Sequence, residues 1–275
     1  MDQINPLTAV ANRTEGSRLA GKVALVTGSA SGVGEAIVRR FQAEGASVLA
    51  VGLQSELLAA LARDTGAAWQ ACDVTREADV RAVLERILRE HGRVDIVVNA
   101  AGVMHIDDVA DIDDAHWSRL LDVNLTGAMR TCRAVLPTMR RQCGGALVNV
   151  ASVAAFNASP GMASYAASKA GLVALTRSLA NRYGEDGIRA NCLCPGWVRT
   201  PMSEFEMQAA AQSQHTSVEA EFEKLTARIA LRRVAQPEEI ASCALFLASD
   251  EASFVTGTVL LADGGARLAT SSRAL

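Results

Sequence analysis

Near its N-terminus the chain reads Val23-Ala24-Leu25-Val26 and then Thr27-Gly28-Ser29-Ala30-Ser31-Gly32-Val33-Gly34. The four apolar residues are typical of a short buried strand. Beyond the glycines, apolar residues recur at helical spacing up to Gly45, which is a stop signal for a helix. Glycines let a backbone approach a phosphate, and the N–H groups at the start of a helix point at the anion. The spacing Gly-x-x-x-Gly-x-Gly alone is a weak signal, but its place between a strand and a helix indicates a dinucleotide-binding unit.

Apolar runs of this kind recur along the chain and alternate with helical stretches. The strand candidates are Val23–Val26, Val48–Val51, Val94–Val98, Ala146–Val150, Ile188–Leu193 and Val259–Leu261, and the helical stretches include Glu77–Arg89 and Ala163–Arg182. Strands read as continuous apolar runs when helices cover both faces of a parallel sheet. We therefore predict an α/β fold of the doubly wound Rossmann type, a three-layer α/β/α sandwich with a parallel sheet of about seven strands. Its ligand site belongs at the carboxyl ends of the strands.

A second motif lies in the longest helical stretch, where Tyr165-Ala166-Ala167-Ser168-Lys169 places a phenol and an ammonium four residues apart. Four residues are about one helical turn, so both side chains project from one face. Free tyrosine titrates near pH ~10, and a nearby cation favours the phenolate that acid–base catalysis needs. Ser152, thirteen residues before Tyr165, offers a hydroxyl that could hold a substrate oxygen. A Tyr-x-x-x-Lys pair by itself is also common on solvated helix faces.

With these motifs the chain resembles the single-domain branch of the short-chain dehydrogenase/reductase family, from about Gly21 to Gly265. The shared motifs are, in order, Thr27–Gly34, Asp73-Val74, Asn99-Ala100-Ala101-Gly102, Asn124, Ser152, Tyr165-x-x-x-Lys169, Pro195-Gly196 with Thr200, and Asp263-Gly264-Gly265. One departure is Ala100, where the family often has a second asparagine. The number of motifs in the same order makes coincidence a poor explanation.

The resemblance implies a role for each matching residue. Tyr165 would be the acid/base, Ser152 would fix the substrate oxygen, and Lys169 would lower the pKa of Tyr165 and hold the nicotinamide ribose. Asn124 would anchor a water on a proton path from Lys169 to solvent. The remaining matches would contact the cofactor: Gly28, Ser31, Gly32, Val33 and Gly34 at the pyrophosphate, Asp73 and Val74 at the adenine, Asn99 and Gly102 beside the cofactor, and Pro195, Gly196, Val198 and Thr200 around the nicotinamide.

The choice between NAD and NADP depends on the end of the second predicted strand. An NAD enzyme of this family usually has a carboxylate at position 52, and an NADP enzyme often has arginine at the next position and a basic residue before the second glycine. Here these positions hold Gly52, Leu53 and Ser31. With no cation to meet a phosphate, NAD(H) is favoured over NADP(H). Arg39 and Arg40 are interpreted as the solvated face of the helix rather than a phosphate clamp.

Composition excludes several other classes of function. The 27 basic and 30 acidic residues give no strong field for nucleic acid or an anionic membrane. No apolar run is long enough for a membrane span, and the N-terminus lacks the pattern of a signal peptide, so a cytoplasmic location is expected. The six cysteines and four histidines show no metal-ligand spacing, so no metal is predicted. Cys192 and Cys194 are interpreted as free buried thiols, and His105 as a loop residue at the rim of the site.

One domain accounts for the length of 275 residues, because no linker rich in proline, glycine or serine divides the chain. Residues 1–20 are expected to be a loose leader, and residues 21–275 a single dinucleotide-binding and catalytic domain. Residues from about 200 to 230 would form a substrate lid. The apolar residues that could line a pocket there are Met104, Val153, Phe156, Trp197, Met202, Phe205, Met207 and Phe222, and they could equally pack two short helices together.

We therefore predict an oxidoreductase that transfers a hydride between a nicotinamide cofactor and a small-molecule secondary alcohol or ketone. If half of those apolar residues face the cofactor, the substrate is mainly apolar, and no basic residue is obviously placed to grip a carboxylate or phosphate. The alternatives are an NADPH-dependent ketoreductase of 3-oxoacyl thioesters and a non-catalytic dinucleotide-binding regulator. A homotetramer is implied by the resemblance, and the apolar residues Leu172, Val173, Leu175, Leu179 and Ala180 on more than one side of their helix agree with it.

Overall fold

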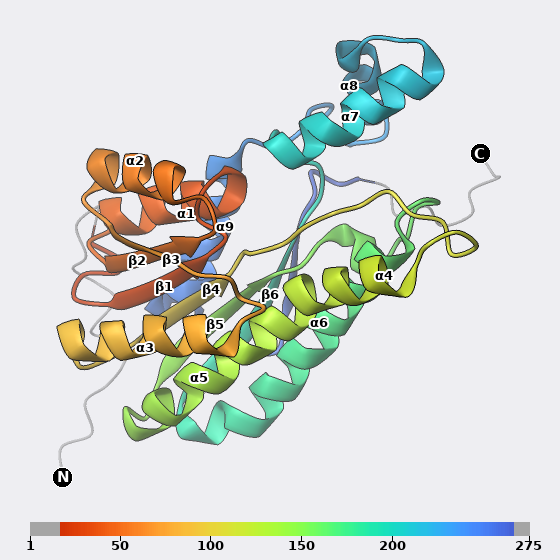
Figure 1. Cartoon of the computed structure of the whole chain (residues 1–275). Helices are drawn as coiled ribbons and strands as arrows, with labels where there is room; N and C mark the ends of the chain where they lie inside the picture. Colours follow the sequence, from red (N-terminus) through yellow and green to blue (C-terminus); the bar gives the residue numbers. More distant parts are fainter. Residues whose placement is uncertain (1–16, 267–275) are drawn as a thin grey trace.

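A computed structural model describes residues 17–266, which form three layers around one parallel sheet (Figure 1). The sheet has seven strands in the order β3-β2-β1-β4-β5-β6-β7, and every neighbouring pair is parallel. The strands are β1 (Val23–Thr27), β2 (Ser47–Gly52), β3 (Ala68–Ala71), β4 (Ile96–Asn99), β5 (Gly145–Val150), β6 (Ile188–Pro195) and β7 (Val259–Ala262). The predicted doubly wound architecture is confirmed.

Helices cover both faces of the sheet, as the apolar character of the strands requires. Figure 1 shows α1 (Gly32–Ala43), α2 (Ser55–Thr65) and α9 (Pro237–Ala248) on one face. On the other lie α3 (Glu77–His91), α5 (Gly127–Arg141) and α6 (Ala163–Tyr183). Two buried clusters fill the spaces between the layers, one built around Phe41 and Ile37 of α1, the other around Met139 and Val135 of α5.

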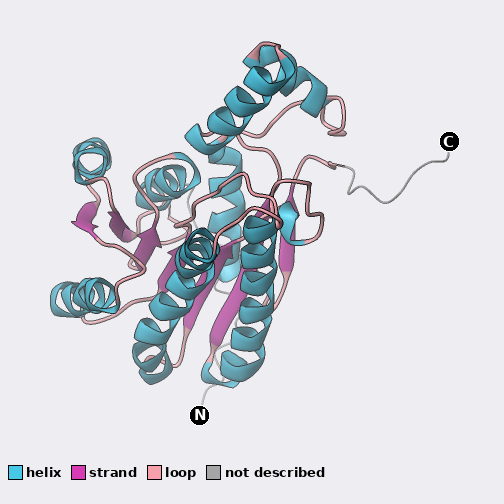
Figure 2. Cartoon of the chain, turned by 45° about the vertical axis from the view of Figure 1, so that its right-hand side comes forward, coloured by secondary structure: helices cyan, strands magenta, loops and turns pink. Residues whose placement is uncertain are grey.

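The remaining helices lie at the carboxyl edge of the sheet or beside α6. The helix α4 (Asp114–Leu121) precedes α5, while α7 (Pro201–Gln214) and α8 (Val218–Thr226) follow β6. Figure 2 shows α7 and α8 standing clear of the sandwich, beyond the carboxyl ends of the strands. They occupy the part of the chain in which the sequence predicts a lid.

Two strands differ from the sequence prediction. The edge strand β3, of sequence Ala-Trp-Gln-Ala, was not among the predicted strands because it is only half-buried and has no β-branched residue. The predicted run Val94–Val98 starts as a strand only at Ile96. The peptide groups of Val94 bond instead to the side-chain amide of Gln142, with N–H to Oε1 at 3.1 Å and Nε2 to the carbonyl at 2.9 Å.

The predicted leader is described only from residue 17 onward, and residues 1–16 lie outside the described residues. Leu19 is fully buried against α1, and its N–H donates to the carbonyl of Glu44 at 2.9 Å. The last residues of that stretch are thus part of the domain. Between residues 17 and 266, none of the helices has both the length and the apolar character needed to cross a membrane.

Candidate active site

The turn after β1 is pressed against two neighbouring segments, and only glycine fits there. A side chain at Gly34 would place its Cβ 2.1 Å from the carbonyl oxygen of Gly28, and one at Gly28 would lie 2.6 Å from the backbone of Ala101. The Thr27 hydroxyl accepts hydrogen bonds from the N–H groups of Ala100 and Ala101, both at 3.2 Å. These contacts hold the start of α1 close to the loop after β4. A pyrophosphate that binds at the N-terminus of a helix needs such a close approach of glycine backbone.

A cavity of about 1730 Å³ runs from this turn along the carboxyl edge of the sheet to the lid helices. It exceeds the ~300–1,000 Å³ of ordinary small-molecule sites, so it has room for a dinucleotide together with a substrate. Nearly all the residues predicted for the site line it: Gly28, Ser31, Gly32, Val33, Gly34, Asp73, Val74, Gly102, Ser152, Tyr165, Lys169, Pro195, Gly196, Val198 and Thr200. The two that do not are Asn99 and Asn124.

Asn99 lies behind the cavity wall, in the buried layer. Its Nδ2 donates to Oδ1 of Asn149 at 2.8 Å, and Asn149 donates in turn to the hydroxyl of Thr176 at 2.8 Å. The Oδ1 atom of Asn99 has no hydrogen-bond partner among the residues that the structure describes. This side chain connects β4 through β5 to α6, and the place of Asn99 beside the cofactor stays a prediction.

Asn124 occupies a π-helical turn, Asp122–Thr126, that joins α4 to α5. Its side chain bonds both peptide groups of Val103, accepting from the N–H at 2.8 Å and donating to the carbonyl at 2.9 Å. It also donates to the hydroxyl of Ser168 at 3.1 Å. A Cβ on Gly102 would lie 3.4 Å from the Lys169 Nζ and 3.5 Å from Asn124 Oδ1, so these residues converge beside the cavity. Such π-helical turns often occur at functional sites.

Tyr165 and Lys169 lie one turn apart on α6, as the spacing predicts, and both are buried. The Lys169 Nζ lies 5.6 Å from the centre of the Tyr165 ring and donates to the carbonyl of Val150 at 2.9 Å. Ser152 accepts from the N–H of Ala154 at 3.1 Å, and its hydroxyl also bonds that of Tyr165. The phenol, the ammonium and the hydroxyl therefore meet at one place on the cavity wall.

Burial shifts the pKa values of both Tyr165 and Lys169. Burial raises the pKa of Tyr165 to about 12, against the opposing effect of the Ser152 hydrogen bond, and the nearby Glu206 carboxylate raises it further. Burial also disfavours the charged ammonium of Lys169 and lowers its pKa to about 8. The phenol is thus held as a proton donor at neutral pH.

Near the end of β2 the structure agrees with the interpretation of the two α1 arginines as residues of the solvated helix face. Arg39 pairs with Glu35 at 2.8 Å and with Asp64 at 3.1 Å, and Arg40 pairs with Glu44 at 3.0 Å. Neither arginine lines the cavity, whose wall here is formed by Gly52, Leu53 and Gln54.

The wall near the lid is more polar than the sequence suggests. Of the apolar residues predicted to line a pocket, Val153, Trp197 and Met202 do so. Met207 and Phe222 are buried within the lid and Phe156 and Phe205 are exposed, while Met104 packs against Tyr165 and its neighbours. Three arginines for which the sequence indicates no obvious role at the site, Arg119, Arg228 and Arg232, also line the cavity. Glu206 also lines it, and no motif in the sequence singled out these four residues.

The lid helices are fastened to the loop that carries Val198 and Thr200. Thr200 caps α7 by accepting from the N–H of Ser203 at 3.3 Å, and Ser203 accepts from the N–H of Thr200 at 3.1 Å. Arg199 pairs with Glu204 of α7 at 2.5 Å, and its guanidinium lies 4.0 Å from the ring centre of Phe222 on α8. A change in this loop would therefore reach both helices.

The remaining predictions concern histidines, cysteines and metals. His105 is exposed and stacks on His116 with ring centres 5.1 Å apart, away from the cavity wall. Cys192 and Cys194 are free and buried, as predicted, with their sulfurs 4.0 Å apart. Within residues 17–266 no cluster of side chains has the makeup of a metal site.

Comparison with known proteins places this geometry in a family. A family model described as enoyl-(acyl carrier protein) reductase matches residues 28–267. The oxidoreductase UcpA of Salmonella typhimurium is 40% identical over 92% of this chain and 97% of its own. A 3-oxoacyl-(acyl-carrier-protein) reductase of Thermotoga maritima is 37% identical over 90% of this chain and 98% of its own. A solved short-chain dehydrogenase/reductase structure from Burkholderia xenovorans superposes with a TM-score of 0.84 at 39% identity, covering 90% of this chain and 97% of that one.

Proposed function

The chain belongs to the short-chain dehydrogenase/reductase family of NAD(P)-dependent oxidoreductases, and we propose that it transfers a hydride between the cofactor and a secondary alcohol or ketone. The observation that carries this proposal is the convergence of Ser152, Tyr165 and Lys169 on a cavity that begins at the glycine turn. The tight turn and the size of the cavity fit a dinucleotide. The cofactor, when bound, supplies or accepts the hydride.

We assign the proton transfer to Tyr165. In reduction its phenol donates a proton to the ketone oxygen, and in oxidation its phenolate takes the proton from the alcohol. The Ser152 hydroxyl hydrogen-bonds the same substrate oxygen and fixes its position. Lys169 would hold the ribose hydroxyls of the cofactor and favour the phenolate when charged, and Asn124 would hold a water between Lys169 and solvent. The contacts of Asn124 with Val103 and Ser168 support a fixed position for that side chain.

We propose NAD(H) as the preferred cofactor. The support is that Arg39 and Arg40 are engaged with carboxylates of their own helix or of α2, and that the wall at Gly52, Leu53 and Gln54 carries no cation. A 2′-phosphate would therefore lose its hydration there without gaining a charged partner.

Two measurements test the proposal. Fluorescence titration with NADH and with NADPH should give tighter binding of NADH, and a preference for NADPH would contradict the cofactor assignment. Tyr165→Phe should bind NADH like the wild type but lose turnover by at least about 10²-fold, the usual contribution of one acid–base group. Full activity of this variant would remove Tyr165 from the mechanism, and failure to bind either dinucleotide would favour a different function for the fold.

A second candidate is a ketoreductase of 3-oxoacyl thioesters with NADPH. It is favoured by the similarity to the reductase of Thermotoga maritima and by the arginines Arg119, Arg228 and Arg232 on the cavity wall, which could meet an anionic carrier. Faster reduction of an acetoacetyl thioester than of any simple ketone, with NADPH rather than NADH, would select this candidate.

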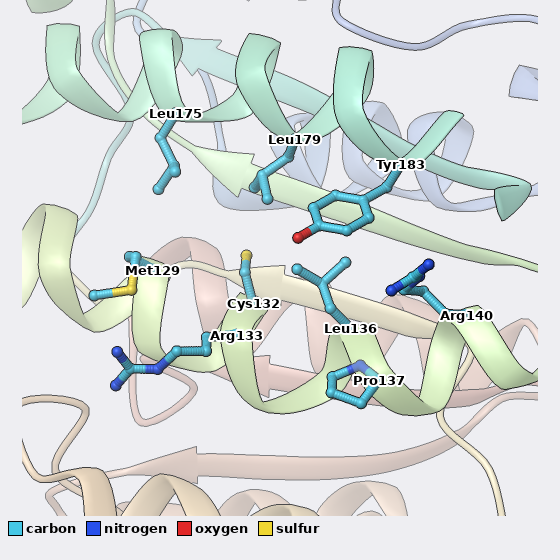
Figure 3. Close-up of a pocket in the computed structure, with 9 residues that line it drawn as sticks. All are labelled: Met129, Cys132, Arg133, Leu136, Pro137, Arg140, Leu175, Leu179 and Tyr183. Atoms are coloured by element: carbon cyan, nitrogen blue, oxygen red, sulfur yellow. The ribbon is translucent and has the colours of Figure 1, made fainter. Parts of the chain in front are cut away.

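We further propose that the protein assembles as a homotetramer through the outer faces of α5 and α6. Leu172, Val173, Leu179 and Ala180 are buried within the chain's own fold and need no partner. The support comes instead from a groove of about 410 Å³ between the two helices (Figure 3). Leu175 and Tyr183 of α6 point into it toward α5, Leu175 on the side of Met129 and Cys132 and Tyr183 on the side of Leu136. The groove between α5 and α6 is lined by both apolar and polar side chains. Such a surface suits packing against the same face of another copy of the chain.

A further inference from the structure

Glu206, on α7, is the one carboxylate of the cavity wall without a partner in the described part of the chain. The other two acidic residues on the wall are engaged in their own loops. Asp73 accepts from the N–H and the hydroxyl of Thr75, at 2.9 and 2.7 Å, and Asp263 accepts from the N–H of Gly265 at 2.9 Å. A polar side chain that faces a cavity without a partner is free to bind a ligand.

The helix itself determines where Glu206 points. Met202 and Ser203, which line the cavity, lie four and three residues before it, so the three share one face of α7. Glu204 lies on another face and pairs with Arg199 at 2.5 Å. The two carboxylates of α7 therefore differ in their surroundings. Glu204 holds the helix to Arg199, and Glu206 faces the cavity.

Electrostatics agree with this orientation. Burial raises the pKa of Glu206 to about 7, and the negative charge of Glu206 raises the pKa of Tyr165. Both residues line the same cavity, so the carboxylate shares this space with the catalytic phenol. The cationic groups on the same wall are Lys169 of α6, Arg119 of α4, and Arg228 and Arg232 beyond α8.

We propose that Glu206 is a specificity-determining residue that accepts a hydrogen bond from a second hydroxyl group of the substrate, distinct from the reacting carbinol. The substrate class is thus a diol, polyol or hydroxyketone rather than a mainly apolar alcohol, and this inference rests on the proposed function. A neutral hydroxyl suits the site better than an ammonium group, because four cationic side chains already line the cavity.

The test compares alcohols that differ by one hydroxyl group in the wild type and in Glu206→Met, which keeps the length of the side chain but removes the acceptor. The substrates are cyclohexanol and the cyclohexane 1,2-, 1,3- and 1,4-diols. A hydrogen bond to a charged group corresponds to about 10- to 100-fold in kcat/KM. We expect the wild type to prefer at least one diol over cyclohexanol, and Glu206→Met to lose that preference by this factor. Glu223→Met, which changes an exposed carboxylate of α8, should keep it.

The pH profile gives a readout that a purely structural role would not move. Oxidation of cyclohexanol should rise with pH as Tyr165 forms its phenolate. Removing the Glu206 charge lowers the Tyr165 pKa, so the rise should occur at lower pH in Glu206→Met than in the wild type. An unchanged midpoint, or equal use of cyclohexanol and every diol by the wild type, would overturn this inference and leave the proposed function standing. A wild type that binds NADH but oxidises no alcohol would overturn both.

Discussion

At the end of β2 the backbone leaves space for a side chain that this chain does not have. A Cβ on Gly52 would meet its nearest neighbours, Ser29 N and Ala30, at 3.7 and 3.8 Å, which is ordinary contact. The residue also has no left-handed backbone conformation that would require glycine. The backbone at position 52 would therefore accept a carboxylate side chain without a steric clash.

Gly52→Asp should increase the preference for NADH over NADPH. The new carboxylate would accept hydrogen bonds from the ribose hydroxyls of NADH and repel the 2′-phosphate of NADPH. We expect the ratio of the two dissociation constants to move toward NADH by about 10-fold or more, the size of one charge-assisted hydrogen bond. Fluorescence titration measures both constants, and Gly52→Asn is the control of equal size without the charge. The same ratio in both variants would place the adenosine ribose elsewhere.

At the scale of single elements, the orientation of Tyr165 depends on how α6 begins. Asp107, in the loop after β4, is buried and accepts from the N–H of Ala163 at 2.7 Å and from that of Ser164 at 3.4 and 3.3 Å through its two carboxylate oxygens. It also accepts a short hydrogen bond from the Ser164 hydroxyl. A negative charge that caps the first turn stabilises a helix. Asp107 thereby fixes the turn that carries Tyr165.

Asp107→Asn should lower the free energy of unfolding by about 1–2 kcal/mol, because the amide replaces one acceptor by a donor that faces the N–H groups of α6. Chemical denaturation measures this change, and turnover should fall with it while binding of NADH is kept. The matched control is Asp113→Asn, since Asp113 caps α4 from an exposed position by accepting from His116 N–H at 2.8 Å. An equal loss in both variants would show that the buried cap has no special part in holding α6.

The sequence predicts elements whose conformation depends on local residue preferences. It does not predict elements whose conformation depends on contacts with residues distant in the chain. The run Ala163–Arg182 is a helix within one residue of its predicted end, because it is rich in alanine and leucine and contains no proline, and helix propensity is a local property. The π-helical turn at Asp122–Thr126 has no sequence signal, since it arises where α4 meets α5 and Asn124 is drawn to Val103. Glu206 was missed for the same reason. Its place on the wall depends on how the lid stands over the cavity.

For the molecule as a whole, the proposed homotetramer depends on the groove between α5 and α6. Leu175 is half-buried in its wall, and the residues that line the groove also include Arg133 and Arg140 (Figure 3). If a second copy covers this face, a lysine at position 175 would place a charge in a buried interface, where an unpaired charge is strongly unfavourable.

Sedimentation of the wild type should therefore give a particle of four times the chain mass of 28.9 kDa, and Leu175→Lys should give smaller species at the same micromolar concentration. Leu57→Lys is the matched control, because Leu57 is 50% exposed on α2 and the change adds the same charge on a different face. Circular dichroism checks that both variants keep their fold. A wild type that sediments as a monomer would contradict the tetramer. A tetramer that survives in Leu175→Lys would move its interfaces away from α5 and α6.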